Sequence, residues 1–376
     1  MDVLISGASM AGLSAAWWFA RLGHRVTVVE RADGLRPGGA PIDVRGRALG
    51  TAQRMGILAQ IDAQKVPILD PMPVLDGSGT QVATLDLRWF ANETDEDIEI
   101  TRDRLNRILL GAIPAGVDFR FRTSIASMED GAGGVDVVFT DGAKGRYRLV
   151  VGADGLHSNV RRLAFGPEKD YVRHFGYYVA LVDLPRDREW QRGMLNVPGL
   201  TIAVRDAGDG PQGMMLVASP ELVCDYRDLD AHRRLIGDFL SRVDAWQVPA
   251  LRAAFADPAA RGFYFDSVSQ TRMPSWIQGN AAVIGDAGHC AALLSGMGTT
   301  LAMVAAESLA NTWTEFGGNM ERTSPVYHDR LRPYVEQCQA FALEGAPIMV
   351  PLTQQALDER NATFRAYAAR FAAATL

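Results

Sequence analysis

A glycine-rich loop between two short apolar runs is the feature of this sequence that most limits its possible folds. The run Val3-Leu4-Ile5 leads into the loop at 7–12, an apolar stretch continues to Leu22, and a β-branched run at 25–30 ends with Glu30. Strand, tight turn, helix and strand in this order predict a βαβ unit. Such a unit is typical of a parallel sheet covered by helices, so we expect an α/β protein.

The loop itself indicates a dinucleotide site. In this fold the first glycine allows a tight turn, the second lets a pyrophosphate approach the backbone, and the third lets the helix pack on the strand. Gly7 and Gly12 fill the first and third positions, whereas Ser9 stands at the second. The pyrophosphate would rest on the start of the helix, and Glu30 would accept hydrogen bonds from an adenosine ribose. The alternative is an ordinary turn followed by a surface glutamate.

Two further motifs each place an aspartate directly after an apolar strand. Asp154 lies in the segment Gly152–Arg161, and Asp286 follows the strand that ends at Gly285. At the carboxyl edge of a parallel sheet such carboxylates can meet the hydroxyl groups of a ligand. Either aspartate alone could simply cap a helix. Together with the first loop, in this order, they form a specific signal.

Composition excludes several other classes of protein. The 376 residues carry a net charge of −6, which argues against a nucleic-acid partner. The three cysteines lie far apart, so we expect neither a disulfide framework nor a cysteine metal site. We expect no metal site and a cytoplasmic location. Because no long uncharged apolar run occurs, we also expect no membrane partner.

In combination, the three motifs resemble those of the class A FAD-dependent monooxygenases, which have the p-hydroxybenzoate hydroxylase fold. The resemblance spans nearly the whole chain and looks closest to the branch of tetracycline monooxygenases and antibiotic-tailoring enzymes. It implies that FAD is the cofactor and that NADPH or NADH is a transient reductant. It also implies the residues that bind the ADP half of FAD: Gly7, Ser9, Met10, Ala11, Gly12, Glu30 and Arg31.

The same resemblance implies roles for residues further along the chain. Asp154 is expected to link the flavin and pyridine nucleotide sites, Asp286 to bind the ribityl chain, and Asp43 to lie beside the flavin. A helix that starts near Thr299 would point its positive end at the reduced ring. Each arginine could instead be a solvated surface cation. The remaining expected cofactor contacts are Arg36, Arg45, Arg102, Gly285, Gly296, Met297 and Gly298.

The resemblance and the pattern of short strands predict an interleaved organisation. A Rossmann-like FAD-binding domain with a parallel sheet would comprise 1–70, 100–165 and 276–345. A mainly antiparallel β-sheet domain for the substrate would comprise 71–99 and 166–275. Residues 346–376 would form a C-terminal helix that braces both domains, and Arg47 to Gln64 would form one helix.

The chemistry implied by the resemblance belongs to the flavin, so no catalytic side chain is predicted. The implied reaction is hydroxylation of an aromatic or polyketide-like small molecule by O2 through a flavin C4a-hydroperoxide. A FAD-dependent reductase or oxidase of antibiotic biosynthesis is the alternative, because Ala292 and Leu293 stand where the family usually has proline. A binding module that sequesters an antibiotic and an NAD-only dehydrogenase are further alternatives.

Candidate substrate contacts lie on the strands of the second domain. Tyr178, Arg205 and Met214 are the residues we select, although methionine and aromatic side chains on such strands more often fill a core. His289 is interpreted as a structural, backbone-bonded histidine instead of an acid or base. The sequence predicts neither the substrate's identity, the regiochemistry, the choice between NADH and NADPH, nor the oligomeric state.

Overall fold

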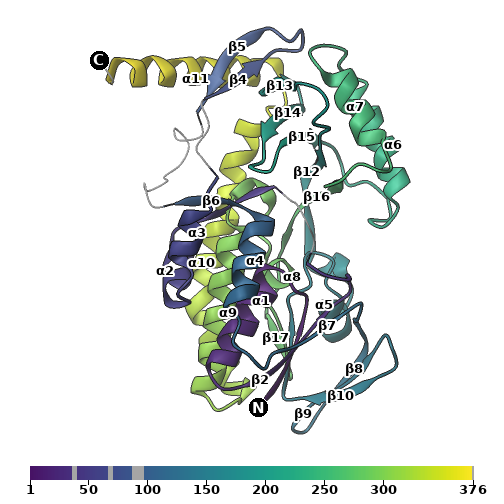
Figure 1. Cartoon of the computed structure of the whole chain (residues 1–376), viewed down its shortest axis with the longest axis vertical. Coiled ribbons are helices and arrows are strands. Elements are labelled where there is room, and N and C mark those ends of the chain that lie inside the picture. The colour runs from purple at the N-terminus through teal and green to yellow at the C-terminus, as the bar shows by residue number, and fades with distance from the viewer. Residues whose placement is uncertain (36–39, 67–70, 87–96, 375–376) are drawn as a thin grey trace.

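Figure 1 shows two large sheets: one lies at the end of the molecule that holds the N-terminus, and the other lies at the end that holds the C-terminus. The computed structural model describes residues 1–35, 40–66, 71–86 and 97–374. A parallel sheet is combined with an inserted, mainly antiparallel sheet. The expected fold class is therefore confirmed.

The first sheet has six strands in the order β17-β18-β11-β1-β2-β7, and neighbours run parallel except for the pair β17–β18. Val3, Leu4 and Ile5 are fully buried at its centre, which explains the continuous apolar run. The strands are β1 (Asp2–Ser6), β2 (Arg25–Glu30), β7 (Asp118–Phe121), β11 (Leu149–Gly152), β17 (Ile277–Gln278) and β18 (Ala281–Val283).

Helices cover one side of this sheet, and a small antiparallel sheet contacts it as well. Helix α1 (Met10–Arg21) packs along α9 (Gly298–Glu315) and α4 (Arg102–Ala112). Val135, Val137 and Phe139 share the core of β1 and β11, so part of the cover expected from helices comes from strands. These strands are β8 (Ile125–Gly131), β9 (Gly134–Phe139) and β10 (Lys144–Tyr147).

The expected helix from Arg47 to Gln64 is broken into α2 (Arg47–Arg54) and α3 (Leu58–Ala63). Gly56 has φ +72° between them, a left-handed conformation that ends the first helix. Nearby, β3 (Pro41–Val44) pairs with β6 (Ile98–Thr101). Because β6 pairs with β3, residues 98 and 99 do not join the large antiparallel sheet to which the sequence assigned them.

The second large sheet has seven strands in the order β16-β12-β15-β14-β13-β4-β5. Its pairs are antiparallel except for β13–β4, through which the early hairpin joins the later strands. Helices α6 (Leu229–Leu240) and α7 (Val248–Ala256) pack on it through Ile236 and Phe255. The strands are β4 (Met72–Leu75), β5 (Gln81–Leu85), β12 (Val172–Asp183), β13 (Gly193–Val197), β14 (Leu200–Asp206), β15 (Pro211–Ala218) and β16 (Tyr264–Thr271). The division into a cofactor domain and a substrate domain stays a prediction.

Two long helices complete the chain. Helix α10 (Met320–Met349) enters the first core with Val335 and a core beside the seven-stranded sheet with Ala342. Helix α11 (Gln354–Ala374) packs on β5 and β13 (Figure 1). Helix α10 thus contributes side chains to both cores, and the brace expected of residues 346–376 stays a prediction. Within the described ranges, no helix is long and apolar enough to cross a membrane.

The docking of α11 depends on Phe364, which is 1% exposed in a cluster with Val74 and Leu85. We expect Phe364→Ala to lower the free energy of unfolding by about 3–4 kcal/mol, because it leaves a cavity in this cluster. Urea unfolding measures the effect. Thr363→Ala, at an exposed position of the same helix, should change it by less than about 0.5 kcal/mol. Equal effects of the two changes would contradict the packing of α11.

Candidate cofactor site

Two glycines of the first loop lie where a side chain would not fit. Gly7 has φ +106°, and a Cβ there would lie 2.4 Å from the carbonyl oxygen of Ala153. A Cβ on Gly12 would lie 1.9 Å from the carbonyl oxygen of Gly7. Helix α1 therefore begins directly against the loop, with Met10 and Ala11 in its first turn. The N–H groups of such a turn have no partner within the helix and can bind an anion.

Ser9 connects this loop to another predicted residue. It stands at the N-cap of α1, and its hydroxyl accepts a hydrogen bond of 3.2 Å from Nη2 of Arg102. Arg104 instead donates to the carboxylate of Asp209 at 2.8 Å. Arg102 is thus the arginine of α4 that brings positive charge to the glycine loop.

Glu30 fixes the same loop from the end of β2. Its carboxylate accepts backbone hydrogen bonds from Ala8 and Ala32, each 2.9 Å long. A carboxylate has about four acceptor positions, so capacity for a ribose hydroxyl remains. Arg31 is exposed beside it. Arg36 lies outside the described residues.

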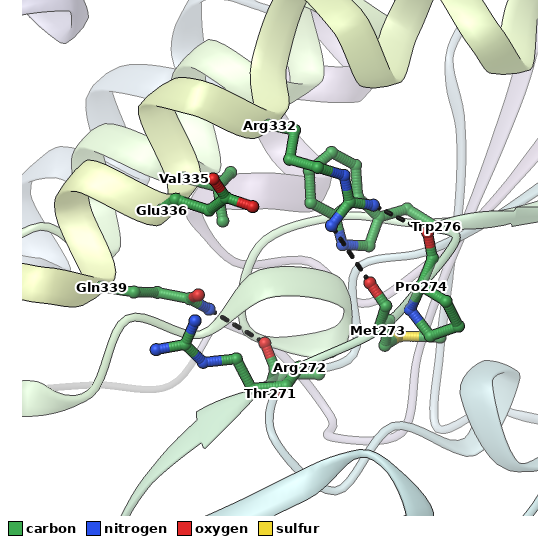
Figure 2. Close-up of a pocket in the computed structure, with 9 residues that line it drawn as sticks. All are labelled: Thr271, Arg272, Met273, Pro274, Trp276, Arg332, Val335, Glu336 and Gln339. Atoms are coloured by element: carbon green, nitrogen blue, oxygen red, sulfur yellow. Dashed lines mark hydrogen bonds between the residues drawn. The ribbon is translucent and has the colours of Figure 1, made fainter.

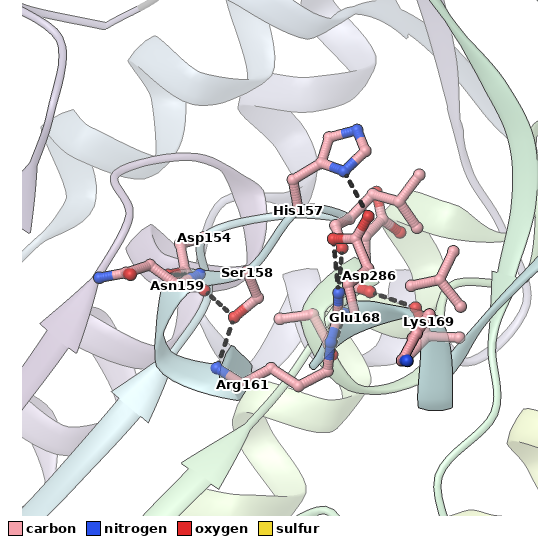
Figure 3. Close-up of polar contacts among 12 residues, drawn as sticks. Asp154, His157, Ser158, Asn159, Arg161, Glu168, Lys169 and Asp286 are labelled. Carbon is pink, nitrogen blue, oxygen red and sulfur yellow. Dashed lines mark hydrogen bonds and ion pairs between the residues drawn. The ribbon is translucent and has the colours of Figure 1, made fainter. Parts of the chain in front are cut away.

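Asp154 organises the loop that follows β11 (Figure 3). Its carboxylate accepts hydrogen bonds from the Ser158 hydroxyl and from the backbone N–H groups of Asn159 (2.9 Å) and Val160 (3.1 Å). Burial raises the pKa of Asp154, and these hydrogen bonds oppose the shift. The carboxylate thus caps α5 (Asn159–Ala164), and its expected link between two nucleotide sites stays a prediction.

The third motif lies against the first. Gly285 has φ +60°, and a Cβ there would lie 2.9 Å from the Cβ of Ala11. Asp286 begins the short helix α8 (Asp286–His289) and is exposed. Burial among protein atoms nevertheless raises its pKa, and Arg102 opposes the shift. Its exposed carboxylate therefore stays accessible to a ligand, and we refer to the region where the expected cofactor contacts converge as the cofactor cleft.

Asp43 and Arg45 meet the loop that precedes α9. The carboxylate of Asp43 lies 2.8 Å from Nη2 of Arg45. A Cβ on Gly296 would lie 3.3 Å from Asp43 and 3.4 Å from Arg45. Met297 is the N-cap of α9, and Gly298 is its first residue. Segments that are 250 residues apart thus converge at the start of this helix.

Comparisons with known proteins show to which family a chain with this arrangement belongs. A family model described as an FAD binding domain matches residues 1–191. A flavin-dependent monooxygenase of Legionella longbeachae is 32% identical over 371 residues, which cover 96% of this chain and 93% of the relative. The chain belongs to the class A FAD-dependent monooxygenases.

Two further similarities also span nearly the whole chain. An uncharacterized protein of Mycobacterium tuberculosis is 36% identical over 95% of this chain and 96% of its own length. The crystal structure of tetracycline destructase Tet(51) superposes with a TM-score of 0.82 and 27% identity, covering 97% of this chain and 96% of that one. The monooxygenase described here is therefore a flavoenzyme with FAD as its cofactor.

The residues fit FAD. The crowded glycines leave a backbone cradle for the pyrophosphate, and Arg102 supplies a cation beside it. Glu30 and Asp286 supply carboxylates that can accept hydrogen bonds from hydroxyl groups. The individual contacts stay predictions, because the structure shows the residues and not the cofactor's atoms.

Glu99 is a further charged residue of the site that sequence reasoning missed. It lies directly opposite Asp43 in the register of β3 and β6. Burial raises the pKa of Glu99, as does the nearby Asp43. Arg205, on β14, has its pKa lowered by burial, while Glu99 and Asp43 oppose the shift. The only sequence signal was one glutamate between Ile98 and Ile100 in a short strand.

The candidate substrate contacts fall into different environments. Arg205 faces the acidic pair, and its Nη2 donates to Oε1 of Gln212 at 3.1 Å. Met214 is partly buried between two apolar clusters. Tyr178 is 4% exposed, stacks on Phe265 and accepts a hydrogen bond from the Leu222 N–H. The structure therefore packs Tyr178 against Phe265, and its expected substrate contact stays a prediction.

Two cavities lie apart from the motif residues. One, of about 270 Å³, lies between α10 and the end of β16; Arg332 covers the Trp276 ring there and donates to Pro274 (Figure 2). The other, of about 520 Å³, lies beside Arg107 and Arg186. None of the predicted cofactor residues is among the described residues that line either cavity.

Gly12→Ala should reduce FAD affinity by about 100-fold or more, because the new methyl group displaces the loop from Gly7. Flavin fluorescence during titration of the apoprotein measures this. Gly111→Ala is the control, since a Cβ on Gly111 in α4 meets nothing within 4 Å. Unchanged FAD affinity in Gly12→Ala would show that the cradle does not depend on this contact.

His289 should stay neutral across the physiological range. The ring is 1% exposed, and among the described residues neither ring nitrogen has a hydrogen-bond partner of ordinary geometry. The expected bond to the backbone stays a prediction. Burial lowers the pKa of His289 to about 3. Since the folded pKa lies below the unfolded one, protonation favours unfolding, and His289 removes stability as the pH falls below about 6.5.

NMR of labelled histidine tests this prediction. The His289 ring signals should not titrate between about pH 5 and pH 8, whereas those of an unperturbed histidine do. His289→Gln assigns the signals. A midpoint near the ordinary histidine value would contradict the buried, neutral state.

Proposed function

We propose that this monooxygenase hydroxylates an aromatic or polyketide-like small molecule, with NADPH or NADH as reductant of FAD and O2 as the oxygen source. The position of Arg205 carries the proposal. This arginine belongs to the seven-stranded sheet, whose β14–β15 turn meets the end of β6: Arg104 Nη2 donates to the carbonyl oxygen of Gly208 at 3.1 Å, and a Cβ on Gly208 would lie 3.2 Å from Thr101. Glu99 and Asp43, on β6 and β3, are the carboxylates that act on the charge of Arg205. A molecule held by the second sheet would therefore face the flavin side of the cleft.

The protein's own groups bind and orient in this proposal. Bound FAD supplies electron storage and oxygen transfer. The start of α1 and Arg102 hold negative charge at one end of the cleft, and the start of α9 directs the positive end of an 18-residue helix toward Gly296. Arg205 can bind an anionic or carbonyl oxygen, and Glu99 can accept a hydrogen bond from a hydroxyl group.

The likeness to a tetracycline destructase over 97% of the chain supports a substrate of the tetracycline kind, which is polycyclic and rich in oxygen.

The three free cysteines support a reducing location, and we propose the cytoplasm.

A FAD-dependent reductase or oxidase of antibiotic biosynthesis is the second candidate. The loop between α8 and η3 (Leu293–Ser295) favours it, because Ala292 has φ +71°. A non-glycine residue in this region is uncommon and occurs at functional sites. A changed loop there would alter access to the cofactor.

Isotopically labelled O2 separates the two candidates. The FAD-loaded enzyme is incubated with NADPH or NADH and with tetracycline, followed by a panel of aromatic and polyketide compounds. We expect the substrate to accelerate NAD(P)H consumption and the product to carry one labelled oxygen, detected by mass spectrometry. Free FAD in place of the protein is the control. Turnover of a compound without label in its product would reject hydroxylation in favour of the reductase or oxidase.

A further inference from the structure

A series of hydrogen-bonded side chains, most of them charged, connects the second motif with the seven-stranded sheet. The residues of this series that lie between the two are not among the expected cofactor contacts. His157, within that motif, has a carboxylate near each ring nitrogen, and Figure 3 shows its contact with Glu168. Its Nδ1 is 2.9 Å from Oε1 of Glu168, and its Nε2 is 3.4 Å from Oδ1 of Asp266. Its ring also stacks on Tyr226, with the centroids 4.1 Å apart.

The two carboxylates make His157 a cation. Burial alone would lower its pKa, but the hydrogen bonds with Asp266 and Glu168 raise it to about 9. The protonated ring donates to both carboxylates at neutral pH. The charged and titratable groups that face it are Glu168 from η2 (Glu168–Asp170), Asp266 from β16 and Tyr226 from the segment before α6.

One end of this series of side chains, the Glu168 end, reaches the third motif. Glu168 also accepts a hydrogen bond of 3.0 Å from Nη2 of Arg161, whose side chain is fully buried. Nη1 of Arg161 donates to the carbonyl oxygen of Ala287 at 2.9 Å. Ala287 directly follows Asp286, so this hydrogen bond also holds the backbone that carries the Asp286 carboxylate.

The other end reaches the cofactor cleft. Asp266 accepts a hydrogen bond of 3.2 Å from the hydroxyl of Tyr264. Tyr264 is 37% exposed, yet burial among protein atoms raises its pKa well above the ordinary value. Asp286 and Arg102, two expected cofactor contacts, are among the charges that act on this hydroxyl. The strand that carries Tyr264 also packs against α8, where the Thr271 hydroxyl donates to the carbonyl oxygen of Asp286 at 2.7 Å. This strand therefore connects Tyr264 with the third motif.

We propose that His157 is a positioning residue for FAD, which holds Asp266 and, through it, the side chain of Tyr264 at the wall of the cofactor cleft. Without the imidazolium, Asp266 would lose its cationic partner and keep the 2.7 Å hydrogen bond from the Ser267 N–H, so its carboxylate would be held less firmly as the acceptor for Tyr264. The inference rests on FAD binding alone and is independent of the proposed hydroxylation. The competing explanation is that His157 only packs the two sheets together.

A double-mutant cycle on FAD affinity distinguishes the two explanations. Apoprotein of the wild type, His157→Gln, Tyr264→Phe and the double variant is titrated with FAD, and quenching of flavin fluorescence gives each Kd. We expect each single change to raise the Kd about tenfold, and the double variant to stay within about twofold of Tyr264→Phe. Side chains that act along one path give such non-additive losses, whereas packing alone gives losses that multiply.

The pH dependence provides a second readout. The wild-type Kd for FAD should rise as the pH passes about 9, where His157 loses its proton, and His157→Gln should lack this rise. A wild-type Kd that is flat through this range would contradict the proposal. Where His157→Gln does not fold, Asp266→Asn replaces it in the cycle, because it interrupts the same path with an amide of the same shape.

His174→Gln is the matched control. His174 also bridges two segments of this sheet, with Nδ1 2.7 Å from the Ser267 hydroxyl and Nε2 2.9 Å from the Ser219 carbonyl oxygen, but its partners are uncharged. It should keep the wild-type Kd for FAD. If His157→Gln binds FAD as tightly as the wild type, or if the losses in the cycle multiply, the positioning role is wrong.

Discussion

The contact between three backbone segments at Gly7 is the constraint on which this structure depends. The carbonyl oxygens of Gly7 and Ala153 occupy the space that a side chain on Gly12 or Gly7 would need. Helix α1 can therefore begin against both β1 and the loop after β11, and the first and second motifs meet. A side chain here would move the start of α1, and with it the N–H groups available to a pyrophosphate.

Opposite charges assemble around this point from distant parts of the chain. Arg102 comes from α4, Asp286 from the strand-to-helix turn after β18, and Asp43 from β3. Each carboxylate is crowded enough to have a raised pKa, and an arginine opposes each shift. The protein thus keeps polar groups in a cleft instead of a core. This arrangement is stable because each charge retains either a protein partner or access to solvent.

The sequence predicted the motifs well because each is local. The turn at 7–12 and the strand-to-aspartate transitions at Asp154 and Asp286 are recognisable from neighbouring residues alone. The predicted family, fold class and cofactor were confirmed. Glu99 escaped notice because its position opposite Asp43 depends on the register of two strands more than 50 residues apart. The partners of His157 on η2 and β16 likewise depend on tertiary packing. The packing of Tyr178 on Phe265 could not be predicted either, because a strand pattern does not tell which face meets α6 and α7.

The shared helix α10 sets how this enzyme can admit a bulky molecule. Its 30 residues contribute Val335 to one core and Ala342 to another. A motion that separates the two sheets would therefore expose apolar side chains from both cores. Exposing that surface would cost on the order of 25 cal/mol per Å². This cost disfavours a hinge motion between the two sheets. Rotamer changes of side chains along the route are the less costly way to admit and release a molecule.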